Sequence, residues 1–226
     1  MNHKLIGLVG LKTSGKNYIT KLVSENMLEN RLGLTAQFAF ADTLYRGASS
    51  ALGIPFLASK SYSGKDKEML RVTLNSLGIS GRYFNGKQWL IDRLVDGVSN
   101  YFSHHAQNSD ALAIVTDVRL PEEVERLRSL GGRIVLIFNQ KVYQEAFPKL
   151  IDHKWDTDPS TMSALDFEKL AFLASRYEAG EYKDPDVLSA SKLIDYVVSN
   201  NIKDATWKSP HIDDFRRWIG FRKENL

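Results

Sequence analysis

The order of apolar and polar positions predicts short buried strands that alternate with amphipathic helices. Apolar runs bounded by turn residues predict strands over 4–9, 35–40, 111–116, 133–138 and 193–198. Apolar residues spaced three and four apart predict helices over 15–28, 42–52, 65–77, 87–102, 121–130, 162–177 and 212–222. Such alternation is typical of a mostly parallel sheet with helices on both faces. The pattern therefore predicts a doubly wound α/β fold.

Residues typical of helix ends set several of these boundaries. Asp42 is expected to cap the second helix, which Gly53 and Pro55 would stop. Gly78 is expected to end the third helix. The helix that begins at Pro121 lies between two strands, and this order predicts a parallel crossover unit.

One stretch does not follow the alternation. Residues 140–191 are mostly polar and predict an insert or lid, with 162–177 as its most convincing helix. The chain of 226 residues is long enough for one α/β domain with such an insert. We therefore expect a single domain over 1–226.

Composition narrows the class of protein. The hydrophobic fraction of 43% and the charged fraction of 25% are ordinary for a globular protein, and no apolar run predicts a membrane span or signal peptide. The chain has no cysteine, which excludes disulfides and thiolate metal sites, so a cytoplasmic location is the simplest expectation. The net charge of +3 is too small to indicate nucleic-acid binding. A solvated helix face is expected for the basic residues Arg216, Arg217, Arg222 and Lys223.

The strongest chemical signal is the segment from Gly10 to Asn17, Gly-Leu-Lys-Thr-Ser-Gly-Lys-Asn, between the first strand and the first helix. It fits the phosphate-binding pattern G-x-x-x-x-G-K, with Asn17 where Ser or Thr is usual. Gly10 and Gly15 let the backbone curl into a nest of amides at a helix N-terminus. Lys16 would reach the β- and γ-phosphates of ATP. Thr13 and Ser14 are further loop residues that could help to bind the nucleotide.

Two residues at the end of the third predicted strand complete the chemical signal. Asp117 stands where parallel α/β sheets place their ligands, so it could hold a water of Mg²⁺ or orient an arginine, or it could cap the next helix. The guanidinium of Arg119 suits a phosphate. The amide oxygen of Asn17 could also ligate Mg²⁺ or hold one of its waters. Lys16, Asp117 and Arg119 are the expected catalytic residues.

The sequence resembles the deoxynucleoside monophosphate kinases of tailed bacteriophages in four segments. The loop has a lysine at Lys12 and, after Ser-Gly-Lys, an amide where the family has an acid or amide. The other matching segments are Phe40 to Arg46 with Ala51 to Ile54, Arg71 to Gly78, and Thr116 to Glu122 through Ile137. The match covers roughly residues 4–138 and the strand near 193–199, and is poor over 140–191.

The resemblance implies a P-loop kinase that uses ATP and Mg²⁺ to phosphorylate a deoxynucleoside monophosphate, in the host cytoplasm if the chain is phage-encoded. It implies that residues 42–105 carry the acceptor-binding helices. The expected acceptor contacts are Asp42, Arg46, Arg71, Arg82 and Trp89. Helix capping for Asp42, solvated arginines, and core packing for Trp89 and Tyr83 stay open as alternatives.

Lid residues and competing functions also stay open. Arg176 and Lys183 are the expected lid residues that close on the phosphates, with Lys141, Lys149 and Lys154 as others; His153 is expected at the surface. A kinase for another small phosphorylated molecule such as phosphomevalonate, a P-loop ATPase or switch, and a nucleotide-binding module without catalysis are the alternatives. The expected partners are ATP and a dNMP, with no nucleic acid or membrane, and a homodimer is one option.

Overall fold

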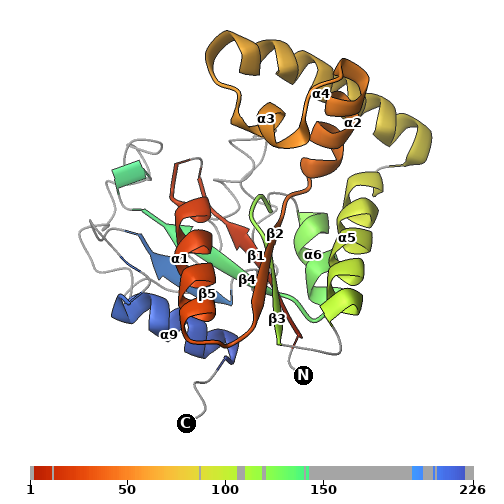
Figure 1. Ribbon diagram of the computed structural model, residues 1–226. Coiled ribbons are helices and arrows are strands. Elements are labelled where there is room, and N and C mark those ends of the chain that lie inside the picture. The colour runs from red at the N-terminus through yellow and green to blue at the C-terminus, as the bar shows by residue number, and fades with distance from the viewer. Residues whose placement is uncertain are drawn as a thin grey trace, which may run out of the picture. The chain divides into compact units, whose positions relative to one another are not determined.

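The computed structural model describes residues 3–11, 13–86, 88–105, 110–118, 121–139, 141–142, 195–200, 206 and 208–221. The chain divides into two compact units (Figure 1). Unit 1 consists of Met1–Gln37 and His104–Leu226, and unit 2 consists of Phe38–Ser103. The predicted helix over 162–177 lies outside the described residues, as does all of the 140–191 stretch except residues 141–142.

Five strands form one sheet in the order β2-β3-β1-β4-β5. Their bounds are β1 His3–Val9, β2 Leu34–Phe38, β3 Ala111–Val115, β4 Arg133–Phe138 and β5 Tyr196–Ser199. The central strand β1 pairs in parallel with β3 and with β4, and β4 pairs in parallel with β5. The apolar runs at β3 and β4 are buried because strands inside such a sheet are covered on both faces. The predicted α/β class, with a mostly parallel sheet flanked by helices, is confirmed.

Alternate residues of β1 point to the two faces of the sheet. Ile6 and Leu8 belong to a buried cluster that includes residues of α1 (Lys16–Glu29) and α9 (Pro210–Ile219). Gly7 points the other way, where a Cβ would lie 2.7 Å from Cδ1 of Leu127 in α6 (Pro121–Ser129). The sheet of unit 1 is therefore covered by α1 and α9 on one face and by α6 on the other (Figure 1).

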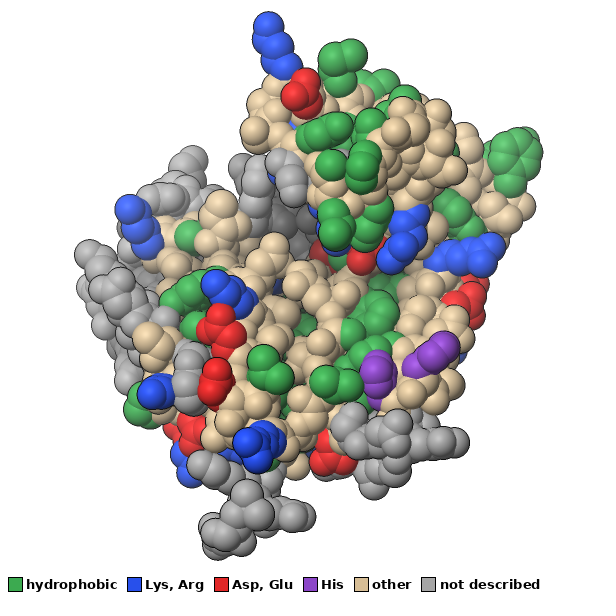
Figure 2. Space-filling model, in the orientation of Figure 1, with side chains coloured by type: hydrophobic (Ala, Val, Ile, Leu, Met, Phe, Trp, Pro, Cys, Tyr) green, Lys and Arg blue, Asp and Glu red, His purple; other side chains and the backbone are tan. Residues whose placement is uncertain are grey.

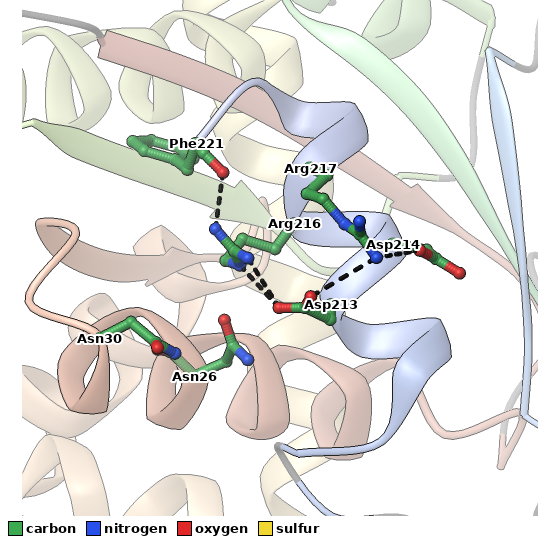
Figure 3. Close-up of polar contacts among 7 residues, drawn as sticks. All are labelled: Asn26, Asn30, Asp213, Asp214, Arg216, Arg217 and Phe221. Carbon is green, nitrogen blue, oxygen red and sulfur yellow. Dashed lines mark hydrogen bonds and ion pairs between the residues drawn. The ribbon is translucent and has the colours of Figure 1, made fainter. Parts of the chain in front are cut away.

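The buried Arg216 joins α9 to Phe221, which lies just after the helix (Figure 3). Arg216 is 4% exposed, and its guanidinium donates to Oδ1 of Asp213 at 2.6 and 3.1 Å and to the carbonyl of Phe221 at 2.7 Å. The hydrogen bond from Arg216, with a weaker contribution from Asn26, holds the pKa of Asp213 below its ordinary value. The prediction that Arg216 lies on a solvated face is wrong, because this residue turns into the core and finds its partners there. Arg217 is exposed as expected, and Arg222 and Lys223 lie outside the described residues.

Unit 2 is helical. It contains α2 (Asp42–Leu52), α3 (Phe56–Ser61), α4 (Gly64–Asn85) and most of α5 (Trp89–His105). Ala48, Leu70 and Leu74 form the small buried cluster that joins α2 to α4. The six-residue helix α3 was not predicted. Gly78 does not end α4, because the helix continues to Asn85. Leu44 packs beside Gly78, since a Cβ built there would lie 3.7 Å from Cδ1 of Leu44.

Several ends differ by a few residues from the prediction. Ala41, and not Asp42, is the N-cap of α2, and Asp42 is the first helical residue. The last helix ends at Ile219, where Gly220 takes a positive φ of 100° that favours glycine. None of the helices within the described ranges is both long and apolar enough to cross a membrane.

Candidate functional site

The loop between β1 and α1 has the backbone of an anion nest. Three of its residues have positive φ: Gly10 at 152°, Thr13 at 67° and Gly15 at 96°. A Cβ on Gly10 would lie 2.7 Å from the carbonyl oxygen of Ile137 and 2.9 Å from Oγ of Ser14, so only glycine fits there. Gly15 is the N-cap of α1 and has no side chain to cap it, which leaves the helix N-terminus to bind an anion.

The ammonium group of Lys16 lies over this loop. Its Nζ donates to the carbonyl of Gly10 at 2.6 Å and to that of Leu11 at 2.8 Å. Both acceptors belong to the loop itself, so the positive charge is held beside the curled backbone. A phosphate bound in the nest would meet the loop amides and this ammonium together.

Two asparagines at the ends of neighbouring strands support the loop. Nδ2 of Asn200, after β5, donates to the carbonyl of Ser14 at 2.8 Å. Nδ2 of Asn139, after β4, donates to the carbonyl of Asn200 at 2.9 Å. A Cβ on Gly15 would lie within 2 Å of the Asn200 amide nitrogen, at 1.9 Å, so the second loop glycine is required by this contact as well as by its positive φ. Ser14 Oγ is buried and has no hydrogen-bond partner in the described structure.

A second polar group lies at the ends of β2 and β3. Nε2 of Gln37 donates to Oδ1 of Asn17 at 3.3 Å and to Oγ1 of Thr116 at 3.4 Å, so these two oxygens share one amide nitrogen. Thr116 is buried, and Asp117, the next residue, is half-buried. The group therefore offers the amide oxygen of Asn17 and the hydroxyl of Thr116. The carboxylate of Asp117 follows Thr116 directly in the sequence, after the end of β3.

This donor set can be tested against Mg²⁺. The ion takes oxygen ligands, keeps several waters, and is usually bound by one or two protein oxygens together with substrate phosphates. Across the described ranges no cluster of three or more acidic or histidine residues forms a closed metal cage. The oxygens of Asn17 and Thr116, with the carboxylate of Asp117 next in the sequence, have the chemistry of the open type of site, in which a nucleotide would supply the remaining ligands.

Gln37, Thr116, Asn139 and Asn200 were not assigned to the site from the sequence. Each lies in or just after a strand, at the edge where open α/β sheets bind ligands. Their common position is the signal that could have identified them. Two predicted site residues of this unit, Lys12 and Arg119, lie outside the described residues, as do Arg176, Lys183, Lys149, Lys154 and His153. Lys141 is described and exposed.

In unit 2, Asp42 and Arg46 belong to a charged cluster around one aromatic ring. Nζ of Lys60 lies 2.6 Å from Oδ1 of Asp42, and the other carboxylate oxygen of Asp42 accepts from the amide of Ala39 at 3.2 Å. The guanidinium of Arg46 lies 4.4 Å from the centre of the Phe56 ring, and the ammonium of Lys60 lies 5.2 Å from it. Phe56 and Lys60 were missed because they lie on α3. The cluster brings two cations together beside an aromatic face.

The other predicted acceptor residues lie on α4 and at the start of α5. Arg71 and Arg82 are both exposed on α4, and at a helical rise of 1.5 Å per residue they are about 16 Å apart along its axis. One phosphate cannot take bidentate contacts from both. The ring of Trp89 is half-buried and packs on Gly81, where a Cβ would lie 2.0 Å from Cζ3 of the indole. Trp89 therefore packs α5 against α4. The side chain of Tyr83 is 81% exposed, and its ring contacts the ring of Phe84 edge-on.

The fold and the loop together define an α/β protein whose first strand and first helix are joined by a glycine-containing loop with the backbone of an anion nest. No protein-family model and no curated protein sequence matches the chain. Among solved structures, the chain is similar to the shikimate kinase of Bacteroides thetaiotaomicron, with a TM-score of 0.39 and 10% sequence identity over 96% of this chain and 98% of that one.

Proposed function

We propose that the protein is an ATP-dependent kinase that transfers the γ-phosphoryl group of ATP to a deoxynucleoside 5′-monophosphate. The observation that carries the proposal is the loop of unit 1, with its three positive-φ residues and the ammonium of Lys16 held over it. Such a nest binds the phosphates of a nucleoside triphosphate. The acceptor class is supported by the resemblance of four segments to the phage deoxynucleoside monophosphate kinases.

The roles at the donor end follow from charge. The loop amides and Lys16 would bind the β- and γ-phosphates and stabilise the charge that moves between them in the transition state. Asn17, Thr116 and Asp117 would hold Mg²⁺ directly or through its waters. Held there, the ion would neutralise part of the negative charge on the nucleotide phosphates. Asn139 and Asn200 would keep the loop in its binding geometry.

The acceptor needs anion contacts and a place for its base. Arg71 and Arg46 would bind its phosphate, and an oxygen of that phosphate attacks the γ-phosphorus as the bond to the β–γ bridging oxygen breaks and ADP leaves. The acceptor oxygen is already ionised at neutral pH, so no general base is required. Phe56, with Lys60 and Asp42 beside it, supplies an aromatic face with polar groups at its edge, which suits a nucleobase and its sugar. Arg82 is left out of this set because of its distance from Arg71.

The test is a coupled ADP-release assay with each of the four dNMPs, their ribose counterparts and phosphomevalonate. Lys16→Ala protein, purified in the same way, measures the contribution of contaminating kinases. We expect ADP release that depends on at least one dNMP and is lost in the variant. Turnover of phosphomevalonate alone would show that the acceptor is not a dNMP. ATP hydrolysis stimulated by DNA would indicate a nucleic-acid motor and not a kinase. Tight ATP binding without any turnover would leave only a binding module.

A further inference from the structure

The long helix α4 carries apolar residues on its solvent side. Met69 is 75% exposed, Val72 68%, Ile79 72% and Tyr83 81%. Together with the exposed Ser76 they follow the spacing of a heptad seam, with 69, 76 and 83 at one position and 72 and 79 at the other. We call these five residues the α4 stripe. Figure 2 shows exposed hydrophobic side chains on the visible face of unit 2.

The α4 stripe is not the face that packs within unit 2. The residues of α4 that turn inward are Leu70, Leu74 and Gly81, all buried, with Leu77 packed against the same cluster. At 100° per residue this inward face and the α4 stripe lie on nearly opposite sides of the helix. The seam therefore needs a partner from outside the unit, since a row of large apolar side chains in water is a typical contact surface.

The charges beside the α4 stripe indicate what that partner is. We propose that a second copy of this chain packs its own α4 antiparallel against the stripe to form a homodimer. In the antiparallel register that places Val72 opposite Ser76 and Met69 opposite Ile79, Glu68 flanks the seam next to Arg82 of the second copy. Two-fold symmetry makes this opposite-charge pair twice.

The same register also gives partners to two further polar residues. Asn75 lies near the two-fold axis and faces Asn75 of the second copy, where two amides can bond each other. Lys65 meets the ring of Tyr83 of the second copy, as a cation over an aromatic face. A parallel pair would instead put Lys65 against itself and Glu68 next to Thr73, with no ion pair. Charge complementarity therefore favours the antiparallel arrangement.

The first test measures self-association of the full chain by sedimentation velocity over a range of concentrations. One helix from each copy makes a small contact, below about 1,200 Å², so a reversible dimer is expected. Val72→Glu and Ile79→Glu should each weaken the dimer by at least about 100-fold, because each buries a carboxylate in the seam. Leu28→Glu is the matched control, since Leu28 is 68% exposed on α1 and should leave the dimer unchanged.

The second test examines the register. Glu68→Arg should weaken the dimer by repulsion from Arg82, and the double variant Glu68→Arg with Arg82→Glu should restore it. The chain has no cysteine, so single cysteines report contacts cleanly. Under oxidation, a mixture of Val72→Cys and Ser76→Cys proteins should give a covalent dimer, whereas either protein alone should give little.

Three results would overturn the proposal. The wild-type chain could stay monomeric at every concentration, which would assign the stripe to some other partner. The dimer could resist both glutamate variants while their far-UV circular dichroism stays native. Ser76→Cys alone could cross-link as well as the mixture, which would indicate a parallel pair.

Discussion

The two units of the chain differ in how many large apolar side chains they leave exposed. Unit 1 buries a large cluster between its sheet and the helices α1 and α9, and polar groups gather around the loop at the carboxyl edge of the sheet. Unit 2 has a buried cluster of three residues joining α2 to α4, and it carries seven of the eleven large hydrophobic side chains that are exposed in the described residues. Unit 1 therefore covers both faces of its sheet and carries the loop of the proposed nucleotide site. Unit 2 leaves apolar surface that a substrate or a second copy would cover.

The largest expected effect is on catalysis and tests the loop of unit 1. Lys16→Ala removes the ammonium that lies over the loop, so kcat should fall by roughly 100- to 1,000-fold or more, while the melting temperature changes little. Steady-state kinetics and a thermal melt measure the two quantities. Lys21→Ala is the control, since Lys21 lies on the same helix, is exposed, and pairs with Glu25 at 3.7 Å. Full activity in the Lys16 variant would take this lysine out of the mechanism.

A smaller effect is expected at the acceptor end. Arg71→Ala in unit 2 should raise KM for the dNMP by about 10- to 100-fold, or about 1.4–2.7 kcal/mol, because a charge-assisted contact to a phosphate is lost. KM for ATP should stay the same, which separates the roles of the two units. The same measurement on Arg93→Ala, an exposed arginine of α5, provides the control. An unchanged acceptor KM would refute the role of Arg71.

The smallest effect concerns stability and pH. Asp213→Asn leaves the guanidinium of Arg216 buried without its carboxylate and should lower the free energy of unfolding by about 2 kcal/mol, less than for a fully buried pair because Asp213 is 37% exposed. The pKa of Asp213 is lowered in the folded state, so the ionised form stabilises the fold above the ordinary pKa of 3.8, and this contribution disappears as the pH falls below it.

Urea unfolding at pH 7 and at pH 3 measures this difference. The gap between wild type and Asp213→Asn should be present at neutral pH and shrink in acid. Asp214→Asn is the matched control, since Asp214 is exposed and pairs with the exposed Arg217. An equal gap at both pH values would show that the carboxylate's charge does not matter.

Local features of this protein could be predicted from its sequence, and contacts between distant segments could not. Gly10 and Gly15 revealed the loop because positive φ is required by the turn itself. The buried strands β3 and β4 were found because their apolar runs are continuous. Helix α3 escaped because six residues are too few for a periodic pattern, and Phe56 and Lys60 were missed with it.

Burial of polar residues was a second feature that could not be predicted from the sequence. Arg216 looks like a surface residue in a basic segment, and only the packing of α9 against the core shows that it is buried. Asn200 and Ser14 are 186 residues apart, so no spacing rule connects them. The fold class and the loop were therefore accessible from the sequence, whereas the polar groups that support the loop required coordinates.

The bond between Asn200 and Ser14 has a consequence for biosynthesis. The loop leaves the ribosome long before the Asn200 amide that braces it, because Ser14 and Asn200 are 186 residues apart. Both strands that pair with β1 also follow the loop in the sequence, at Ala111–Val115 and Arg133–Phe138. A nascent chain that stops before residue 200 would carry the loop without the Asn200 amide that braces it. On the proposed function, ribosome-bound intermediates should acquire ATP affinity only after residue 200 has left the exit tunnel.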